Sequence, residues 1–71
     1  MKTKIEEMGM TRESFPPKLK YFRAQIMGWS QERLAREIGV TALTVSNWER
    51  GRTVPRADGV IRALVGAGFV S

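Results

Sequence analysis

Residues 42–50 combine an amide, two hydroxyls and apolar side chains in a pattern suited to contact with another molecule. If the segment is a helix, a rotation of about 100° per residue puts Val45 and Trp48 on one side, which we predict to be buried. The opposite side then carries an amide that can bond adenine and apolar groups that fit thymine methyls. We therefore predict contacts with DNA bases from four residues, namely Ala42, Leu43, Ser46 and Asn47.

Hydroxyl, amide and guanidinium groups surround this segment in the sequence. Such groups, and free N–H groups at a helix start, bind phosphate oxygens and fix register rather than sequence. The predicted phosphate contacts are Gln31, Thr41, Thr44, Arg50, Arg52 and Thr53. As an alternative, Arg50 and Arg52 are solvated charges near a helix C-terminus, where the helix dipole favours them, and Gln31 and Asn47 are ordinary surface residues.

The net charge of +5 is concentrated in the part of the chain that holds these residues. Positive and negative side chains cancel in residues 1–14, whereas residues 15–71 carry nine Lys and Arg against four Asp and Glu. This distribution suits a polyanionic partner, although a solvated surface with surplus Lys and Arg gives the same balance.

The composition argues against an enzyme and against a membrane protein. The 71 residues include no Cys and no His, so the commonest metal ligands and the commonest general base are missing. No apolar run approaches the roughly 20 residues that span a bilayer. We expect one small cytoplasmic domain with no cofactor, no metal and no membrane partner.

Four helices are predicted to position the site, over Pro17–Met27, Gln31–Ile38, Ala42–Arg50 and Ala57–Val65. Ser30 and Thr41 are N-cap candidates, and Gly39 lies in the tight turn where a positive φ is expected. The predicted inner faces of the two central helices hold Leu34, Ala35, Ile38, Val45 and Trp48. The predicted inner face of the Pro17–Met27 helix holds Leu19, Phe22, Arg23 and Ile26. The predicted inner face of the Ala57–Val65 helix holds Val60, Ile61, Leu64 and Val65.

The chain divides, in this interpretation, into an N-terminal arm over residues 1–14 and a helical domain over residues 15–71. The arm has few large apolar residues, and we expect it to be weakly ordered or ordered only against a partner. Within it, a short helix is predicted over Lys4–Met8, and Thr11 is predicted to cap a turn through Arg12–Ser14.

The stretch GWSQERLAREIGVTALTVSNWERGRTVPR resembles the helix-turn-helix family of the lambdoid phage repressors and Cro, the Xre-like family. The matching residues are Gly28, Trp29, Ser30, Gln31, Leu34, Ala35, Ile38, Gly39, Val40, Thr41, Thr44, Val45, Ser46, Trp48, Glu49, Gly51 and Pro55. The resemblance covers about residues 19–68. It implies an all-α bundle of four or five helices that binds DNA sequence-specifically, usually as a dimer.

The resemblance also implies roles for single residues. Gln31 takes the position that contacts phosphate and braces the recognition helix, and Ala42, Leu43 and Asn47 take positions that read bases. Glu49 takes the position that pairs with an Arg of the first helix. Arg23 stands one residue earlier, relative to Gln31, than that Arg usually does, so the pair requires the intervening corner to absorb one extra residue.

Two further departures shape the expected function. Positions 42 and 43 are both apolar, so we expect thymine contacts and DNA shape to carry much of the specificity. We expect no counterpart of the fifth helix that often helps this family to dimerise, which leaves the dimer contact open. We expect a small transcriptional regulator, a repressor, that binds a double-stranded DNA operator as a homodimer. The alternative is a protein-interaction module, such as an antitoxin or a bridging factor, with partner surfaces at Ile5, Met8, Met10, Phe69 and Val70.

Overall fold

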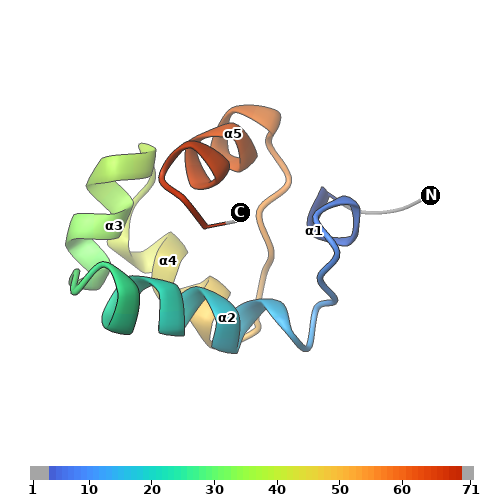
Figure 1. Cartoon of the computed structure of the whole chain (residues 1–71), viewed down its shortest axis with the longest axis horizontal. Coiled ribbons are helices and arrows are strands. Elements are labelled where there is room, and N and C mark those ends of the chain that lie inside the picture. Colours follow the sequence, from blue (N-terminus) through green and yellow to red (C-terminus); the bar gives the residue numbers. More distant parts are fainter. Residues whose placement is uncertain (1–3, 70–71) are drawn as a thin grey trace.

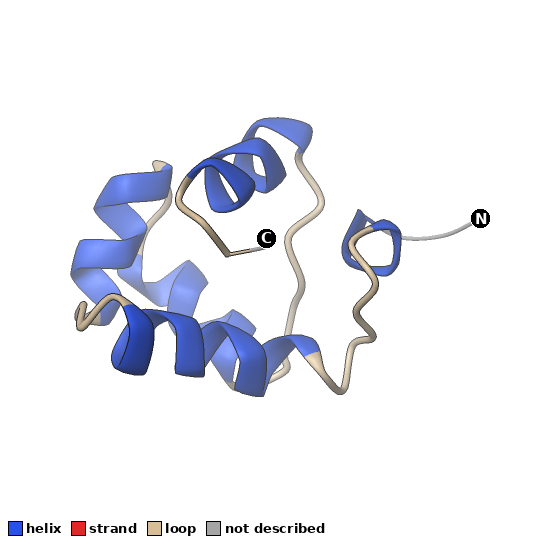
Figure 2. Ribbon diagram, in the orientation of Figure 1, coloured by secondary structure: helices blue, strands red, loops and turns tan. Residues whose placement is uncertain are grey.

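The computed structural model describes residues 4–69, which form five α-helices and, within that range, no strand (Figures 1 and 2). The helices are α1 (Lys4–Glu7), α2 (Phe15–Tyr21), α3 (Gln31–Ile38), α4 (Ala42–Glu49) and α5 (Asp58–Gly66). A π-helical turn, η1 (Phe22–Ile26), continues α2. The predicted all-α class is confirmed. No helix in the described range is long and apolar enough to cross a bilayer.

The helix α4 lies at the centre of the packing (Figure 1). It contacts α3 on one side and α2 on another, and α3 also packs against α5. The side chains of Leu34, Val45 and Leu64 are fully buried where these helices meet. Trp48 is 3% exposed and its ring meets Phe15 edge-on, so the predicted core role of the inner face of α4 is confirmed.

Local capping fixes the two central helices and the turn between them. The Ser30 hydroxyl accepts the Arg33 N–H at the start of α3, and the Thr41 hydroxyl accepts the Thr44 N–H at the start of α4. Gly39 has a φ of 80°, which agrees with the positive φ expected in the turn. The bounds predicted for α3 are confirmed, whereas α4 ends at Glu49, with Arg50 as its C-cap.

The outer helices differ from the sequence prediction in their buried faces. Ile26 is 62% exposed rather than buried, because the π turn adds a residue and rotates Ile26 away from the face set by Leu19. On α5, Val65 is exposed and Ile61 does not join the core. Val60 and Leu64 lie on the inner face of α5 as predicted, and the small side chains of Ala63 and Ala67 complete it at helical spacing.

The segment before α2 packs on the domain in this structure. Ile5 is fully buried and Met10 is 7% exposed, and both belong to the same core as α2 and α4. This packing differs from the weakly held arm that the sequence predicted, because two isolated apolar residues carry no periodicity from which burial can be read. The domain boundary at residue 14 stays a prediction, and Val70 lies outside the described residues.

Candidate nucleic-acid interface

One side of α4 is free of the core and presents most of the predicted base contacts. Leu43 is 69% exposed, and Ser46 and Asn47 are half-buried and point away from the side set by Val45 and Trp48. Ala42 differs from the others, because it packs against the core at the edge of this face. The free face therefore offers one amide, one hydroxyl and one large apolar side chain.

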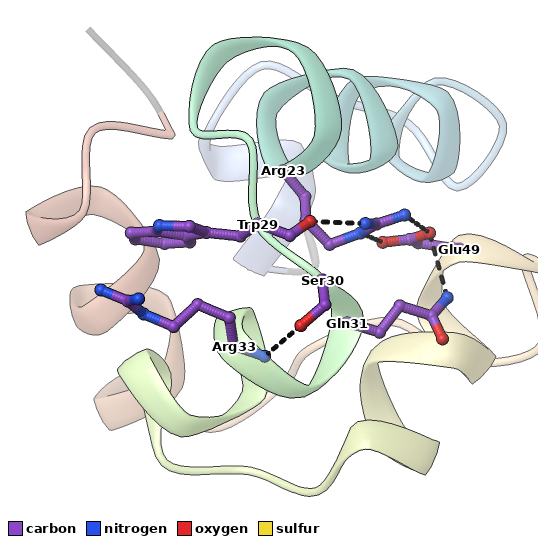
Figure 3. A network of polar contacts seen from close by, with 6 residues as sticks. All are labelled: Arg23, Trp29, Ser30, Gln31, Arg33 and Glu49. Atoms are coloured by element: carbon purple, nitrogen blue, oxygen red, sulfur yellow. Dashed lines mark hydrogen bonds and ion pairs between the residues drawn. The ribbon is translucent and has the colours of Figure 1, made fainter.

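A polar network holds the other flank of α4 to the rest of the domain (Figure 3). Arg23 Nε donates to Glu49 Oε2 at 2.6 Å and its Nη2 donates to Glu49 Oε1 at 3.0 Å. Arg23 Nη1 also donates to the Trp29 carbonyl at 2.8 Å, and Gln31 Nε2 donates to Glu49 Oε1 at 3.2 Å. The network thus joins η1, the corner before α3, the start of α3 and the end of α4.

This network is almost closed to solvent. The side chains of Arg23 and Glu49 are only 12% and 6% exposed. The side-chain hydrogen bond to Glu49 raises the pKa of Arg23 above its usual value, although burial opposes that rise. The guanidinium stays charged throughout the physiological range, and its contact with Glu49 is structural.

The π turn explains how Arg23 reaches Glu49 from one residue earlier in the sequence than the resemblance led us to expect. The Met27 N–H donates to the Phe22 carbonyl at 2.9 Å, five residues back, and the Trp29 N–H donates to the Arg23 carbonyl at 2.8 Å. A π turn holds one residue more than an α-helical turn. The extra residue between Arg23 and Gln31 is therefore absorbed in η1 and the corner before α3.

Five of the six predicted phosphate contacts lie on two opposite flanks of α4. Gln31 lies at the start of α3 beside Glu49, on the flank closed by the network. Thr44 is half-buried on the opposite flank, where its hydroxyl lies 2.8 Å from that of Thr41. Arg52 and Thr53 are exposed in the segment after α4 and line the same groove as Thr44.

Arg50 stands apart from this groove. It is exposed at the C-cap of α4, on the side of Leu43 and Asn47. The six predicted residues therefore do not form one cluster, since they border the free face of α4 from several directions.

Comparison with known families gives a match over residues 19–63 to a model described as helix-turn-helix. The chain belongs to the Cro/CI-type helix-turn-helix family. No curated protein and no solved structure matches it. As a member of this family the chain is, in general terms, a DNA-binding regulator. Its helix-turn-helix consists of α3, the Gly39 turn and α4, and the matched residues begin within α2.

Two cations beside the helix-turn-helix could not be identified from the sequence. Arg12, in the turn before α2, and Arg56, in the loop before α5, line the same groove as Arg52 and Thr44. Arg12 precedes the matched range, and Arg56 lies within it but is not one of the residues that carry the resemblance. Only the three-dimensional packing of the three segments brings these side chains together.

Proposed function

We propose that this chain is a small transcriptional repressor that binds a double-stranded DNA operator sequence-specifically. In this proposal α4 enters the major groove as the recognition helix and α3 supports it across the DNA backbone. The observation that carries the proposal is the Arg23–Glu49–Gln31 network, which fixes the end of α4 to the start of α3 and leaves the Leu43 face uncovered.

The proposed base contacts depend on the chemistry of the free face. Asn47 supplies the amide for an adenine, and Leu43 supplies an apolar surface for thymine methyls. The hydroxyl of Ser46 can donate to or accept from either base of a pair. Ala42 contributes at the edge, where its methyl group is partly covered by the core. Because one amide and one hydroxyl give few hydrogen bonds, we propose that sequence-dependent DNA shape supplies part of the specificity.

The proposed phosphate contacts border that face. Gln31 keeps one amide N–H and its carbonyl beyond the bond to Glu49, and it stands at the N-terminus of α3, where the helix dipole favours an anion. The other contacts proposed are Thr41, Thr44, Arg50, Arg52 and Thr53. These groups would set the register of α4 without reading sequence.

We also propose that the repressor acts as a homodimer in the cytoplasm, with half-sites about 34–36 Å apart. Two apolar side chains of α5, Ile61 and Val65, are left outside the core, and Val65 is 44% exposed. Phe69 is less suited to a partner, because its ring packs edge-on against Phe15 and Phe22 at centroid distances of 5.7 and 5.4 Å. We therefore propose that the dimer contact lies on α5.

A second candidate function is a protein-interaction module, an antitoxin or a bridging factor. It is favoured by Tyr21 and Ile26, which are 61% and 62% exposed beside a groove of about 470 Å³ that Met8 and Phe69 also line. Such a module does not require an uncovered Leu43 face flanked by cations. Nucleic acid that co-purifies with the protein would favour the repressor over this candidate.

The test of the proposed function is selection of binding sites from a random duplex library at 50 and 200 mM salt. We expect a palindromic or pseudo-palindromic consensus whose half-site spacing reports the dimer, and affinity that weakens steeply with salt. If no sequence is enriched at either salt concentration, α4 does not read bases unaided and the interaction module becomes the better account.

The dimer is tested separately by sedimentation of the Val65→Asp variant. A carboxylate in an apolar contact is left unpaired, so we expect this variant to dissociate at concentrations where the unaltered protein is dimeric. Gln25→Asp adds the same charge on exposed η1 and serves as the control. Equal sedimentation of the two variants would rule out α5 as the contact.

A further inference from the structure

Three arginines from separate segments line one groove beside α4, which we call the arginine groove. Arg12 precedes α2, Arg52 follows α4 and Arg56 precedes α5, and the groove between them encloses about 480 Å³. The hydroxyl-bearing residues Thr44 and Thr53 also line it. Among the residues described, no Asp or Glu lines it, so its lining carries positive charge alone.

The backbone that carries Arg12 is fixed on both sides. The Thr11 N–H donates to the Ser14 hydroxyl at 2.8 Å, and the Ser14 N–H donates to the Thr11 hydroxyl at 3.0 Å. Met10 and Phe15, which flank this turn, are both buried in the core. Arg12 therefore projects from a closed, anchored turn rather than from a free tail.

The other two arginines are held in a comparable way. The Arg52 N–H donates to the Asn47 carbonyl at 2.9 Å. Arg52 directly follows Gly51, whose positive φ of 77° turns the chain away from the axis of α4. Arg56 follows Val54 and Pro55, both of which are buried. The three backbone positions are thus set by the fold, and only the side chains are free to adjust to a ligand.

None of these three guanidinium groups makes an ion pair or a side-chain hydrogen bond with any residue in the described range. Arg23 and Arg33, by contrast, each pair with a glutamate at 2.6 and 2.9 Å. Three like charges around one groove repel each other, so an anion that enters the groove relieves that repulsion and gains charge-assisted hydrogen bonds.

The position of the groove identifies the anion. Thr44 lies next to exposed Leu43 in α4, so the groove borders the face proposed to read bases, on the flank opposite Gln31 and Glu49. A recognition helix in the major groove has a sugar-phosphate strand on each side. With α4 in the major groove, as proposed above, the Gln31 flank would face one strand and the arginine groove the other.

We propose that the arginine groove binds the phosphates of that second strand, with Arg12 and Arg56 adding two contacts to those of Arg52 and Thr53. This inference rests on the proposed function, because it requires α4 to lie in the major groove. It extends the DNA contact surface to Arg12, which lies outside the residues 19–63 that match the family. The segment before α2 then serves as part of the DNA-binding surface.

The experiment measures the affinity of the full chain for one selected duplex between 50 and 200 mM salt. The variants are Arg12→Gln and Arg56→Gln, with Arg62→Gln as a control of equal charge change. Arg62 is exposed on α5 and does not line the groove, since it lies about 200° around the helix from groove-lining Val60. Thermal unfolding of each variant confirms that it is folded.

Each groove variant is expected to reduce the slope of log affinity against log salt by about one. The loss of affinity over this fourfold rise in salt should therefore shrink by about 3.5-fold for each arginine removed. The reduction in slope caused by each variant should be equal on cognate and scrambled duplexes, because phosphates carry no sequence. Arg62→Gln should match the unaltered protein, and Arg12→Lys should keep most of the slope because it keeps the charge.

The outcomes separate this inference from the proposed function. If the unaltered protein binds its selected duplex and both groove variants behave like Arg62→Gln, the arginine groove does not bind DNA while the repressor proposal stands. Binding to poly-glutamate is measured alongside. If the groove variants keep their DNA slope but lose a binding to poly-glutamate that the unaltered protein shows, the groove serves an acidic protein and the inference is overturned. If the unaltered protein selects no duplex, the proposed function fails and this inference fails with it.

Discussion

The two flanks of α4 use charged side chains in opposite ways. On one flank Arg23 and Glu49 are nearly buried and satisfy each other within the domain. On the other flank Arg12, Arg52 and Arg56 are exposed and have no partner among the residues described. The comparison teaches that paired charges position α4, whereas unpaired charges are left available for a polyanion.

The energetics of the two flanks differ accordingly. Breaking a buried pair leaves an uncompensated charge in a poorly solvated site, so its loss should appear in folding stability. An exposed arginine keeps its hydration in the folded chain, so its removal should leave stability almost unchanged and alter only DNA affinity. Substitutions on the two flanks should therefore separate stability from binding.

The largest effect is expected for Glu49→Ala, which leaves Arg23 without its ion-pair partner and removes the carboxylate that accepts a hydrogen bond from Gln31. We expect it to lower the free energy of unfolding by about 3–5 kcal/mol, measured by urea denaturation. The matched control is Glu37→Ala, which breaks the exposed Arg33–Glu37 pair on α3 and should cost less than about 0.5 kcal/mol. Equal losses in the two variants would show that the network does not position α4.

A smaller effect, on binding rather than stability, is expected for Arg52→Ala. The side chain is exposed and unpaired among the described residues, so the variant should unfold like the unaltered protein. We expect the salt dependence of duplex binding to fall by about one unit of slope, equally for all sequences. Fluorescence anisotropy on cognate and scrambled duplexes measures this, and a loss confined to the cognate duplex would assign Arg52 to base reading instead.

The smallest effect is expected for deletion of Gln25 from η1. Removing the extra residue allows η1 to become an ordinary α-helical turn while Arg23 keeps its place opposite Glu49, so stability should change by less than about 1 kcal/mol. Deletion of Arg36 from α3 is the contrasting control. It turns Ile38, which is 7% exposed, away from the core and should cost about 2–5 kcal/mol. Similar costs for both deletions would contradict the role given to η1.

The helix-turn-helix could be predicted from the sequence because its signals are local. Ser30 and Thr41 cap their helices, Gly39 takes the left-handed turn, and the spacing of Leu34 to Trp48 fixes the inner faces. The same reasoning was right for Val60 and Leu64 of α5 but wrong for Ile61 and Val65, because a periodicity of large apolar residues does not detect a small residue, Ala63, that packs inward.

The rest of the site depends on packing between distant segments. Nothing in the sequence near Arg12 indicates that its turn would lie beside Arg52 and Arg56, since the contact depends on how Met10 and Phe15 enter the core. The Arg23–Glu49 pair was implied by the resemblance, but the one-residue offset of Arg23 could not be resolved without η1. Local patterns determine the helices, and tertiary packing determines the two flanks.

The measurement that tests the central claim most directly compares the unaltered protein with Asn47→Ala on a cognate duplex and on a scrambled one. If the free face of α4 reads bases, Asn47→Ala should weaken cognate binding by about 1–3 kcal/mol, leave scrambled binding unchanged and keep the salt slope. An equal loss on both duplexes would contradict the claim, because Asn47 would then act as a general backbone contact.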